Sequence, residues 1–133
     1  MKSIAILLFT IVLSQNVFAQ NETLIDERLY AVFEANYLEK LKSDNSFHLK
    51  YYNYYLDNGF EVITMAAEKK ASYEIVEIKD VNNFNILKIQ EEQELKRTYE
   101  TPSFYRIKGT KKLLMLRSEK DFIQRLNKHL GRK

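Results

Sequence analysis

The sequence predicts an α+β fold: helices first, then an antiparallel sheet of four or five strands, then a C-terminal helix packed on one face of the sheet. Three observations support this class. Aromatic residues recur at helical spacing in residues 47–58, two β-rich segments flank Gly109-Thr110, and a helix start follows at Ser118. Helical patterns at both ends of a run of strand patterns are typical of helices segregated from an antiparallel sheet.

The first 19 residues have the organisation of a secretory signal peptide. Lys2 precedes an apolar run from Ile4 to Leu13, and Val17-Phe18-Ala19 supplies a cleavage site. The run is too short to span a membrane. We therefore expect residues 1–19 to be removed and residues 20–133 to form one periplasmic or extracellular domain. Because the chain has no cysteine, burial rather than disulfides must stabilise that domain.

Residues 23–43 have helical spacing, but their apolar stripe drifts around the helix. Thr23, followed three residues later by Asp26, resembles a capping box and marks a helix start. The apolar positions step mostly by four residues, and each step turns the stripe by about 40°. We expect either a kink near Ala35-Asn36 or two short helices, followed by a turn at Ser43-Asp44-Asn45.

The segment from Phe47 to Phe60 is predicted to begin with an aromatic helix that contacts other elements on two sides. Its apolar positions cover an arc of roughly 220°, whereas a surface helix needs about 100°. Ser46 or Asn45 can cap its start, and Asn58-Gly59 can end it in the left-handed conformation. The tyrosines can form core and core edge or a recognition surface, and we favour the core because their spacing fits packing. One side of the helix carries Phe47, Tyr51, Tyr54 and Tyr55.

The middle of the chain is predicted to supply strands. Phe60–Ala66 is β-branched and mostly apolar, which predicts a buried strand. Tyr73–Lys79 and Phe84–Gln90 flank a turn-forming Asp-Val-Asn-Asn segment, which predicts a hairpin. Residues 91–101 are charged and have no clear period, so we expect a short helix or an exposed loop.

The clearest β pattern is a second hairpin near the C-terminus. Ser103–Lys108 and Lys111–Arg117 surround Gly109-Thr110, and glycine at the first position of a two-residue loop suits a type II′ turn. Ser118 with Asp121 then predicts the capped start of a last helix, which a glycine near the C-terminus ends. The apolar positions of that helix are Phe122, Leu126 and Leu130.

Positive charge is concentrated at this end of the chain, although the whole chain carries only +3. Basic side chains clustered at the tip of the predicted hairpin suggest a binding site for an anionic polysaccharide or lipid headgroup. Basic residues on an edge strand can instead serve to prevent edge-to-edge pairing of sheets. Single-stranded nucleic acid would also suit basic and aromatic residues together, but the signal peptide argues against it. The candidate ligand-binding residues are Tyr105, Arg106, Lys108, Lys111 and Lys112.

No catalytic, cofactor or metal motif stands out in the sequence. Three glycines are too few for a dinucleotide or phosphate-binding loop, and no zinc-protease motif is present. His48 could act as a general acid–base or as a partly buried packing residue, and we favour packing. His129 is expected to interact with a helix C-terminus. Glu91, Glu92 and Glu94 lie on one segment, so solvated charge is a better interpretation than a pair of catalytic carboxylates.

Four short stretches of the chain carry a resemblance to a known group of proteins. They are Val17-Phe18-Ala19-Gln20, Arg28-Leu29-Tyr30-Ala31-Val32-Phe33, Tyr51-Tyr52-Asn53-Tyr54-Tyr55-Leu56 and Phe104-Tyr105-Arg106-Ile107-Lys108-Gly109-Thr110. Together they resemble small exported proteins of Bacteroidota that have no assigned activity, and the resemblance spans most of the mature chain. It implies a location in the cell envelope or outside the cell. No activity and no functional residue carries over from it.

The sequence therefore favours an exported, non-enzymatic domain that binds a macromolecular or surface partner, with no cofactor and no membrane span after cleavage. One alternative is a binder of an anionic ligand through the hairpin at residues 105–112. Another is a small hydrolase, which would need a pocket joining His48 or the Glu91 cluster to further polar side chains.

Overall fold

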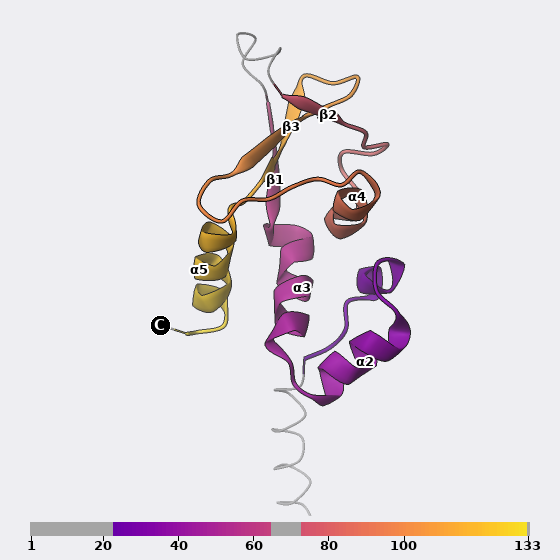
Figure 1. The fold of residues 1–133 in the computed structure, drawn as a ribbon, viewed down its shortest axis with the longest axis vertical. Helices are drawn as coiled ribbons and strands as arrows, with labels where there is room; N and C mark the ends of the chain where they lie inside the picture. Colours follow the sequence, from indigo (N-terminus) through magenta and orange to yellow (C-terminus); the bar gives the residue numbers. More distant parts are fainter. Residues whose placement is uncertain (1–22, 65–72, 133) are drawn as a thin grey trace, which may run out of the picture.

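In the computed structural model, residues 23–64 and 73–132 are described, and they form an α+β domain (Figure 1). The described residues contain one sheet with strands β1 (Phe60–Thr64), β2 (Glu74–Val76), β3 (Ser103–Ile107) and β4 (Lys112–Leu116). Their order across the sheet is β1-β4-β3-β2. The predicted α+β class and the C-terminal helix are confirmed. The predicted signal peptide lies outside the described residues, as do the last two residues of the predicted Phe60–Ala66 strand.

The sheet is mixed rather than wholly antiparallel. Strand β4 pairs antiparallel with both β1 and β3, but β2 pairs parallel with β3, with Val76 opposite Ile107. A parallel pair needs a crossover connection between its strands. The chain between β2 and β3 supplies it, and this segment contains a helix, α4 (Ile86–Glu92).

The hairpin predicted from Tyr73–Lys79 and Phe84–Gln90 is therefore wrong in its second half, which is helical. The local cause is Asn85, whose side chain accepts hydrogen bonds from the backbone N–H groups of Leu87 and Lys88 and so caps a helix start. Ile86 is then fully buried against the sheet.

The hairpin of β3 and β4 is confirmed, but its turn differs by one residue from the prediction. The backbone N–H of Thr110 donates to the Ile107 carbonyl, so Lys108 and Gly109 are the two central residues. Gly109 has a φ of 74° and occupies the third turn position, where a positive φ favours glycine. The Lys112 N–H is bound by the Thr110 side chain instead.

The N-terminal segment forms two short helices, the second of the two predicted alternatives. These are η1 (Glu27–Ala31), a 3-10 helix, and α2 (Ala35–Ser43). Asp26 rather than Thr23 caps η1, since its carboxylate accepts from the Arg28 N–H. The predicted turn after α2 is present, with Asn45 at a φ of 48°.

Helix α3 (Phe47–Asn58) is the predicted aromatic helix, and Ser46 caps it. Its end differs from the prediction, because Gly59 has a φ of −79° and is not left-handed. Glycine is required there for a steric reason. A Cβ on Gly59 would lie 2.3 Å from atoms of the Tyr55 ring.

Helix α5 (Glu119–His129) lies beside α3 where the sheet ends (Figure 1). The strand register places it there, because α3 leads into β1, β4 leads into α5, and Phe60 pairs with Leu116. Its predicted boundaries are confirmed. The Ser118 side chain accepts from the Asp121 N–H, and Gly131 ends the helix region with a φ of 73°.

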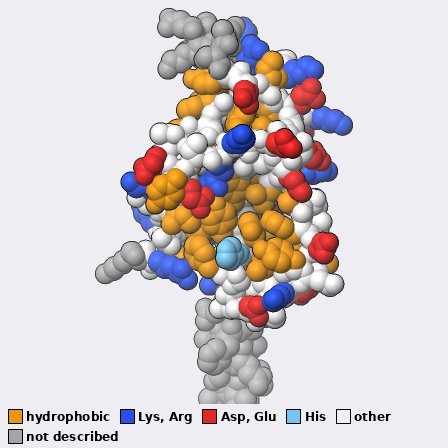
Figure 2. All heavy atoms as spheres, viewed as in Figure 1, with side chains coloured by type: hydrophobic (Ala, Val, Ile, Leu, Met, Phe, Trp, Pro, Cys, Tyr) orange, Lys and Arg blue, Asp and Glu red, His pale blue; other side chains and the backbone are white. Residues whose placement is uncertain are grey.

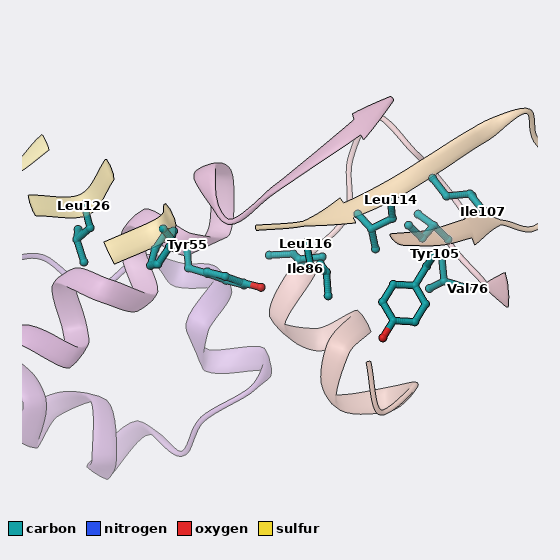
Figure 3. Packing of buried hydrophobic residues seen from close by; sticks show 10 residues of the cluster. Tyr55, Val76, Ile86, Tyr105, Ile107, Leu114, Leu116 and Leu126 are labelled. Atoms are coloured by element: carbon teal, nitrogen blue, oxygen red, sulfur yellow. The ribbon is translucent and has the colours of Figure 1, made fainter. Parts of the chain in front are cut away.

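Two groups of buried side chains form the core, and α3 contributes to both. Tyr55 belongs to the larger group, whereas Leu49 and Leu56 belong to the smaller group with η1 and α2. This confirms that α3 packs on two sides. Figure 3 shows Tyr55 among residues of the larger group, and the Tyr105 side chain pointing away from the strands. The larger group consists of Tyr55, Val76, Ile78, Ile86, Tyr105, Ile107, Leu114, Leu116, Phe122 and Leu126.

Candidate functional site

A cleft of about 440 Å³ opens between α3, α4, the loop after α4 and the start of α5. We call it the aromatic cleft. Figure 2 shows hydrophobic side chains gathered around a histidine on one face of the molecule. The volume is within the range of roughly 300–1,000 Å³ that small ligands occupy in proteins. Its lining residues are Phe47, His48, Tyr51, Tyr52, Tyr55, Leu87, Gln90, Arg97, Glu119 and Ile123.

An ion pair with a shared hydroxyl lies in the wall of the aromatic cleft. Arg97 Nη1 is 2.9 Å from Glu119 Oε2, and it donates to the Tyr51 hydroxyl at 2.7 Å. The same hydroxyl donates to Glu119 Oε2 at 2.7 Å. Three segments that are distant in sequence are thereby fixed to one another: α3, the loop after α4, and the first residue of α5.

The Arg97 side chain is 14% exposed and is held from several directions. Nε donates to the Arg117 carbonyl at 3.0 Å, and the guanidinium carbon lies 4.6 Å from the centre of the Tyr55 ring. Nη2 is buried and has no hydrogen-bond partner among the described residues. Burial lowers the pKa of Arg97, but Tyr55, Tyr51 and Glu119 outweigh it, so the group stays charged.

The tyrosines of the cleft are protonated well beyond neutral pH. Burial raises the pKa of Tyr51 to about 12, and the neighbouring Glu119 adds to this while Arg97 opposes it. Burial also raises the pKa of Tyr55, whose hydroxyl donates to the Gln90 side chain. These hydroxyls therefore act as neutral hydrogen-bonding groups rather than as nucleophiles.

A strip of aromatic rings continues from the cleft on α3, through Phe33 between η1 and α2, to Tyr37 on α2. The Tyr51 and Tyr52 ring centres are 5.8 Å apart at 83°, Tyr52 and Phe33 are 4.6 Å apart, and Phe33 and Tyr37 are 5.5 Å apart. We call Tyr37, Phe33, Tyr52 and Tyr51 the aromatic strip. Tyr37 is exposed and the other three rings are half-buried, so the strip is a contiguous, partly accessible apolar surface, and such surfaces mark interaction sites more often than isolated residues do.

The structure divides the predicted tyrosine surface between core and cleft. Tyr55 is 1% exposed, which confirms the core interpretation for that residue. Tyr51, Tyr52 and Tyr54 are half-buried, and the first two line the cleft. The core interpretation therefore holds for Tyr55, whereas Tyr51, Tyr52 and Tyr54 lie at the edge of the core, and their predicted alternative role in recognition stays a prediction.

His48 is exposed at the mouth of the aromatic cleft, so the prediction that it is a partly buried packing residue is wrong. Its Nδ1 atom lies 3.4 Å from the Ser46 hydroxyl. Glu91, Glu92 and Glu94 are exposed and are not among the residues that line this cleft. His129, the other histidine, stacks on Tyr54 with ring centres 4.6 Å apart.

The predicted basic hairpin site is only partly assembled. Arg106, Lys108 and Lys111 line a second cavity, of about 470 Å³, beside the turn, and we call it the hairpin cavity. Tyr105 and Lys112 do not line it. Tyr105 is buried, and its hydroxyl binds both the N–H and the carbonyl of Lys96, which anchors the loop after α4.

The edge-protection interpretation of these basic residues is wrong for the described sheet. Strands β3 and β4 are its two central strands, whereas β1 and β2 are at its edges. Lys108 also forms an exposed ion pair with Glu77 at 3.0 Å. An exposed pair of this kind contributes little and leaves the lysine available to another anion.

Sequence reasoning missed Arg97 and Glu119, the two charged residues of the aromatic cleft. Arg97 lies in a charged segment without a period, and Glu119 is in the first turn of α5, where acidic residues are common. Neither residue is distinguished locally from its charged neighbours. They are brought together because the loop after α4 is hydrogen-bonded to the start of α5, where the backbone N–H groups of Glu119 and Lys120 donate to the carbonyls of Thr98 and Tyr99.

Within residues 23–64 and 73–132, no helix is long and apolar enough to cross a membrane, and no three potential ligands are grouped for a metal ion. No family model, curated protein or solved structure matches the chain. The resemblance to small exported proteins of Bacteroidota therefore stays a prediction.

Proposed function

We propose that this chain is an exported, non-enzymatic binding domain and that a macromolecular partner docks on the aromatic cleft and the aromatic strip. The observation that carries the proposal is the continuity of these two features. A cavity of ligand size opens directly onto a row of rings in contact, from Tyr51 to Tyr37. Aromatic side chains give large contact area at low entropic cost, as binding surfaces require.

The chemistry of the cleft favours binding over catalysis. The Glu119 carboxylate and the Tyr51 hydroxyl are hydrogen-bonded to each other and to Arg97. A general base or nucleophile needs a pKa near the working pH. The raised pKa of Tyr51 works against that role and suits a fixed hydrogen-bonding network.

The test uses the mature chain, residues 20–133, as bait for the envelope fraction of cells that make the protein. We expect Tyr52→Ser to lose a partner that wild type retains, because Tyr52 joins the cleft to the strip. Tyr99→Ser is the matched control, since Tyr99 is 61% exposed and lies outside both features. Equal capture by Tyr52→Ser and wild type, with both folded, would place the docking surface elsewhere.

A second candidate function is anion binding in the hairpin cavity. It is favoured by one observation, which is that three basic side chains, Arg106 of β3 with Lys108 and Lys111 of the turn, line one cavity. We expect Lys108→Glu/Lys111→Glu to abolish retention on dextran sulfate at low ionic strength, and added salt to weaken wild-type retention. Lys40→Glu/Lys42→Glu on α2 changes the net charge equally and serves as the control. Equal loss in both double variants would argue against a local site.

A further inference from the structure

The two edges of the described sheet differ in how their backbone hydrogen-bonding groups are used. Strands β1 and β2 form these edges, and each of them pairs with a single neighbour. The outer side of an edge strand offers backbone groups to any further strand, so proteins usually block it. The edge of β2 is blocked, whereas the edge of β1 is open among residues 23–64 and 73–132.

A side chain closes the edge of β2. The Lys108 N–H donates to the Val76 carbonyl, so Val76 faces β3, and the backbone groups of Ile75 and Glu77 face outward. Gln93 then binds both groups of Glu77. Its Oε1 accepts from the N–H at 2.8 Å, and its Nε2 donates to the carbonyl at 2.6 Å. Gln93 thus takes the place of a neighbouring strand, and β2 itself is only three residues long.

The outer side of β1 offers backbone groups at three residues. The Arg117 N–H donates to the Gly59 carbonyl, which fixes the alternation of the ladder between β1 and β4. Every second residue from Gly59 faces β4, and the residues between them direct their N–H and C=O groups outward. These residues are Phe60, Val62 and Thr64, and no described residue hydrogen-bonds to their outward groups.

Strand β1 lacks the devices that usually protect an edge. It pairs with β4 over five consecutive positions without a bulge, and it contains no proline and no lysine. Its one charged side chain, Glu61, is bound to Arg117 at 2.9 Å. A row of alternating donors and acceptors of this kind is complementary to the backbone of another extended polypeptide.

We propose that two copies of this chain pair antiparallel through their β1 edges, with Val62 opposite Val62 on a two-fold axis. This register uses every outward group, because Phe60 of each copy then pairs with Thr64 of the other. It brings β-branched side chains together at the axis. It also places Glu61 opposite Ile63, so that no like charges face each other.

A second copy is favoured over a segment of another protein because the edge is complementary to itself. A two-fold contact of this kind is closed after two copies, and two-fold dimers are the commonest homo-oligomers. Dimerisation through β1 is independent of docking at the aromatic cleft, which is lined by α3, α4, the loop after α4 and α5. The two sheets would join into one continuous sheet.

A single introduced cysteine tests the pairing directly, because the chain has none of its own. The Cα atoms of a hydrogen-bonded antiparallel pair are about 5.5 Å apart, a separation that a disulfide spans. We expect Val62→Cys in the mature chain to form a disulfide-linked dimer under mild oxidation. The matched control is Ile75→Cys on the other edge strand, which should not. Ile75 is 52% exposed and Val62 is half-buried, so random collision would favour the control.

Proline substitutions separate dimerisation from folding. The N–H of Thr64 faces outward, so Thr64→Pro removes a donor to the second copy and no bond to β4. We expect this variant to be folded by circular dichroism and to sediment as a monomer under conditions in which wild type sediments as a dimer. The N–H of the neighbouring Ile63 faces β4, so Ile63→Pro should instead lower the melting temperature.

Amide hydrogen exchange follows the same edge in the unsubstituted chain. The amides of Glu61 and Ile63 are bonded to β4 and should be protected at every protein concentration. Those of Val62 and Thr64 should exchange rapidly in dilute solution and become protected as the concentration rises. Their protection should fall again when the solution is diluted.

Wild type that stays monomeric at its highest soluble concentration, or a dimer that survives Thr64→Pro, would overturn the inference. Equal cross-linking of Val62→Cys and Ile75→Cys would overturn it as well. If wild type is monomeric but Thr64→Pro loses a protein captured from the envelope fraction, the edge binds another protein and the assignment to a second copy is wrong. Tyr52→Ser should dimerise as wild type does, so either proposal can fail without the other.

Discussion

Tyr51 and Tyr55 are one turn apart on α3, and their rings lie nearly parallel with centres 6.1 Å apart, yet they have different roles. The Tyr55 ring packs against Gly59 and Phe122, and its hydroxyl donates a hydrogen bond to the Gln90 side chain. Tyr51 is half-buried, and its hydroxyl completes the Arg97–Glu119 pair at the cleft. The same side chain thus belongs to the core in one turn and to the wall of the cleft in the previous one. Segments far away in the sequence make this difference, not the helical period.

The largest effect should come from alkaline pH, which forces both tyrosines to ionise. Burial raises the pKa of Tyr51 from 10.0 to about 12 and raises that of Tyr55 as well. In the unfolded chain these groups lose their protons near pH 10, while the folded chain retains them. The stability is therefore complete below pH 10 and falls as the pH rises through the folded-state pKa values.

Urea unfolding at increasing pH, with tyrosinate absorbance recorded in parallel, measures this loss. The free energy of unfolding of Tyr55→Phe should stay near its own value at neutral pH up to a higher pH than that of wild type does. The reason is that this variant lacks the most buried phenol. Tyr99→Phe, at an exposed position, should change nothing. Stability that is constant up to pH 12 would contradict the burial of these hydroxyls.

Tyr55→Ala should lower the free energy of unfolding by about 3–5 kcal/mol, the usual cost of removing a fully buried aromatic ring. Tyr51→Ala should cost less, because the Tyr51 ring is half-buried at the cleft. Chemical denaturation of the two variants measures the difference directly. Equal losses would mean that the cleft is as tightly packed as the core.

Gly59→Ala should destabilise the domain by about 1–3 kcal/mol, because the added methyl group overlaps the Tyr55 ring. Combined with Tyr55→Leu, the same substitution should cost much less than it does alone. Gly109→Ala is the control, since nothing lies near its Cβ position and its penalty comes from backbone conformation. A double-mutant cycle with Tyr55→Leu should show coupling for Gly59 and none for Gly109.

Tyr51→Phe should have the smallest effect, about 1–2 kcal/mol, because it removes one hydroxyl from a pair of charged partners and keeps the ring. The Arg97–Glu119 contact at 2.9 Å remains and limits the loss. Thermal unfolding of the variant and wild type measures the difference in stability. A loss as large as that of Tyr55→Ala would show that the Tyr51 hydroxyl, rather than the Arg97–Glu119 ion pair, holds this wall of the cleft together.

The parts of the fold that the sequence predicts well are those with local chemical causes. Ser46 and Ser118 cap their helices with their own side chains, and Gly109 takes a conformation that favours glycine. Helix α4 was missed because alternating apolar residues in 84–90 also fit a strand, and the deciding group is the single Asn85 cap. The parallel pairing of β2 was missed because it depends on where the chain returns to the sheet after the crossover through α4.

The aromatic cleft was beyond sequence reasoning for a related reason. Its tyrosines and His48 come from one helix and were identified as candidates, but Gln90, Arg97 and Glu119 come from three other segments. The hairpin candidates were adjacent in sequence, and even there the structure turns Tyr105 into the core. Neighbouring positions on a strand face opposite sides, so a cluster in sequence is divided when the strand forms.

The order of the strands has a consequence for how the protein is made. Among the described residues, strand β1 pairs only with β4, and β2 pairs only with β3. Both early strands can therefore pair only after the segments near the end of the chain have been synthesised. Contacts between such distant segments form late and slow the search for the native topology. A nascent chain that stops before Ser103 lacks the partner strands of both β1 and β2, so a stop codon there should yield a product that proteases remove rather than a smaller stable domain.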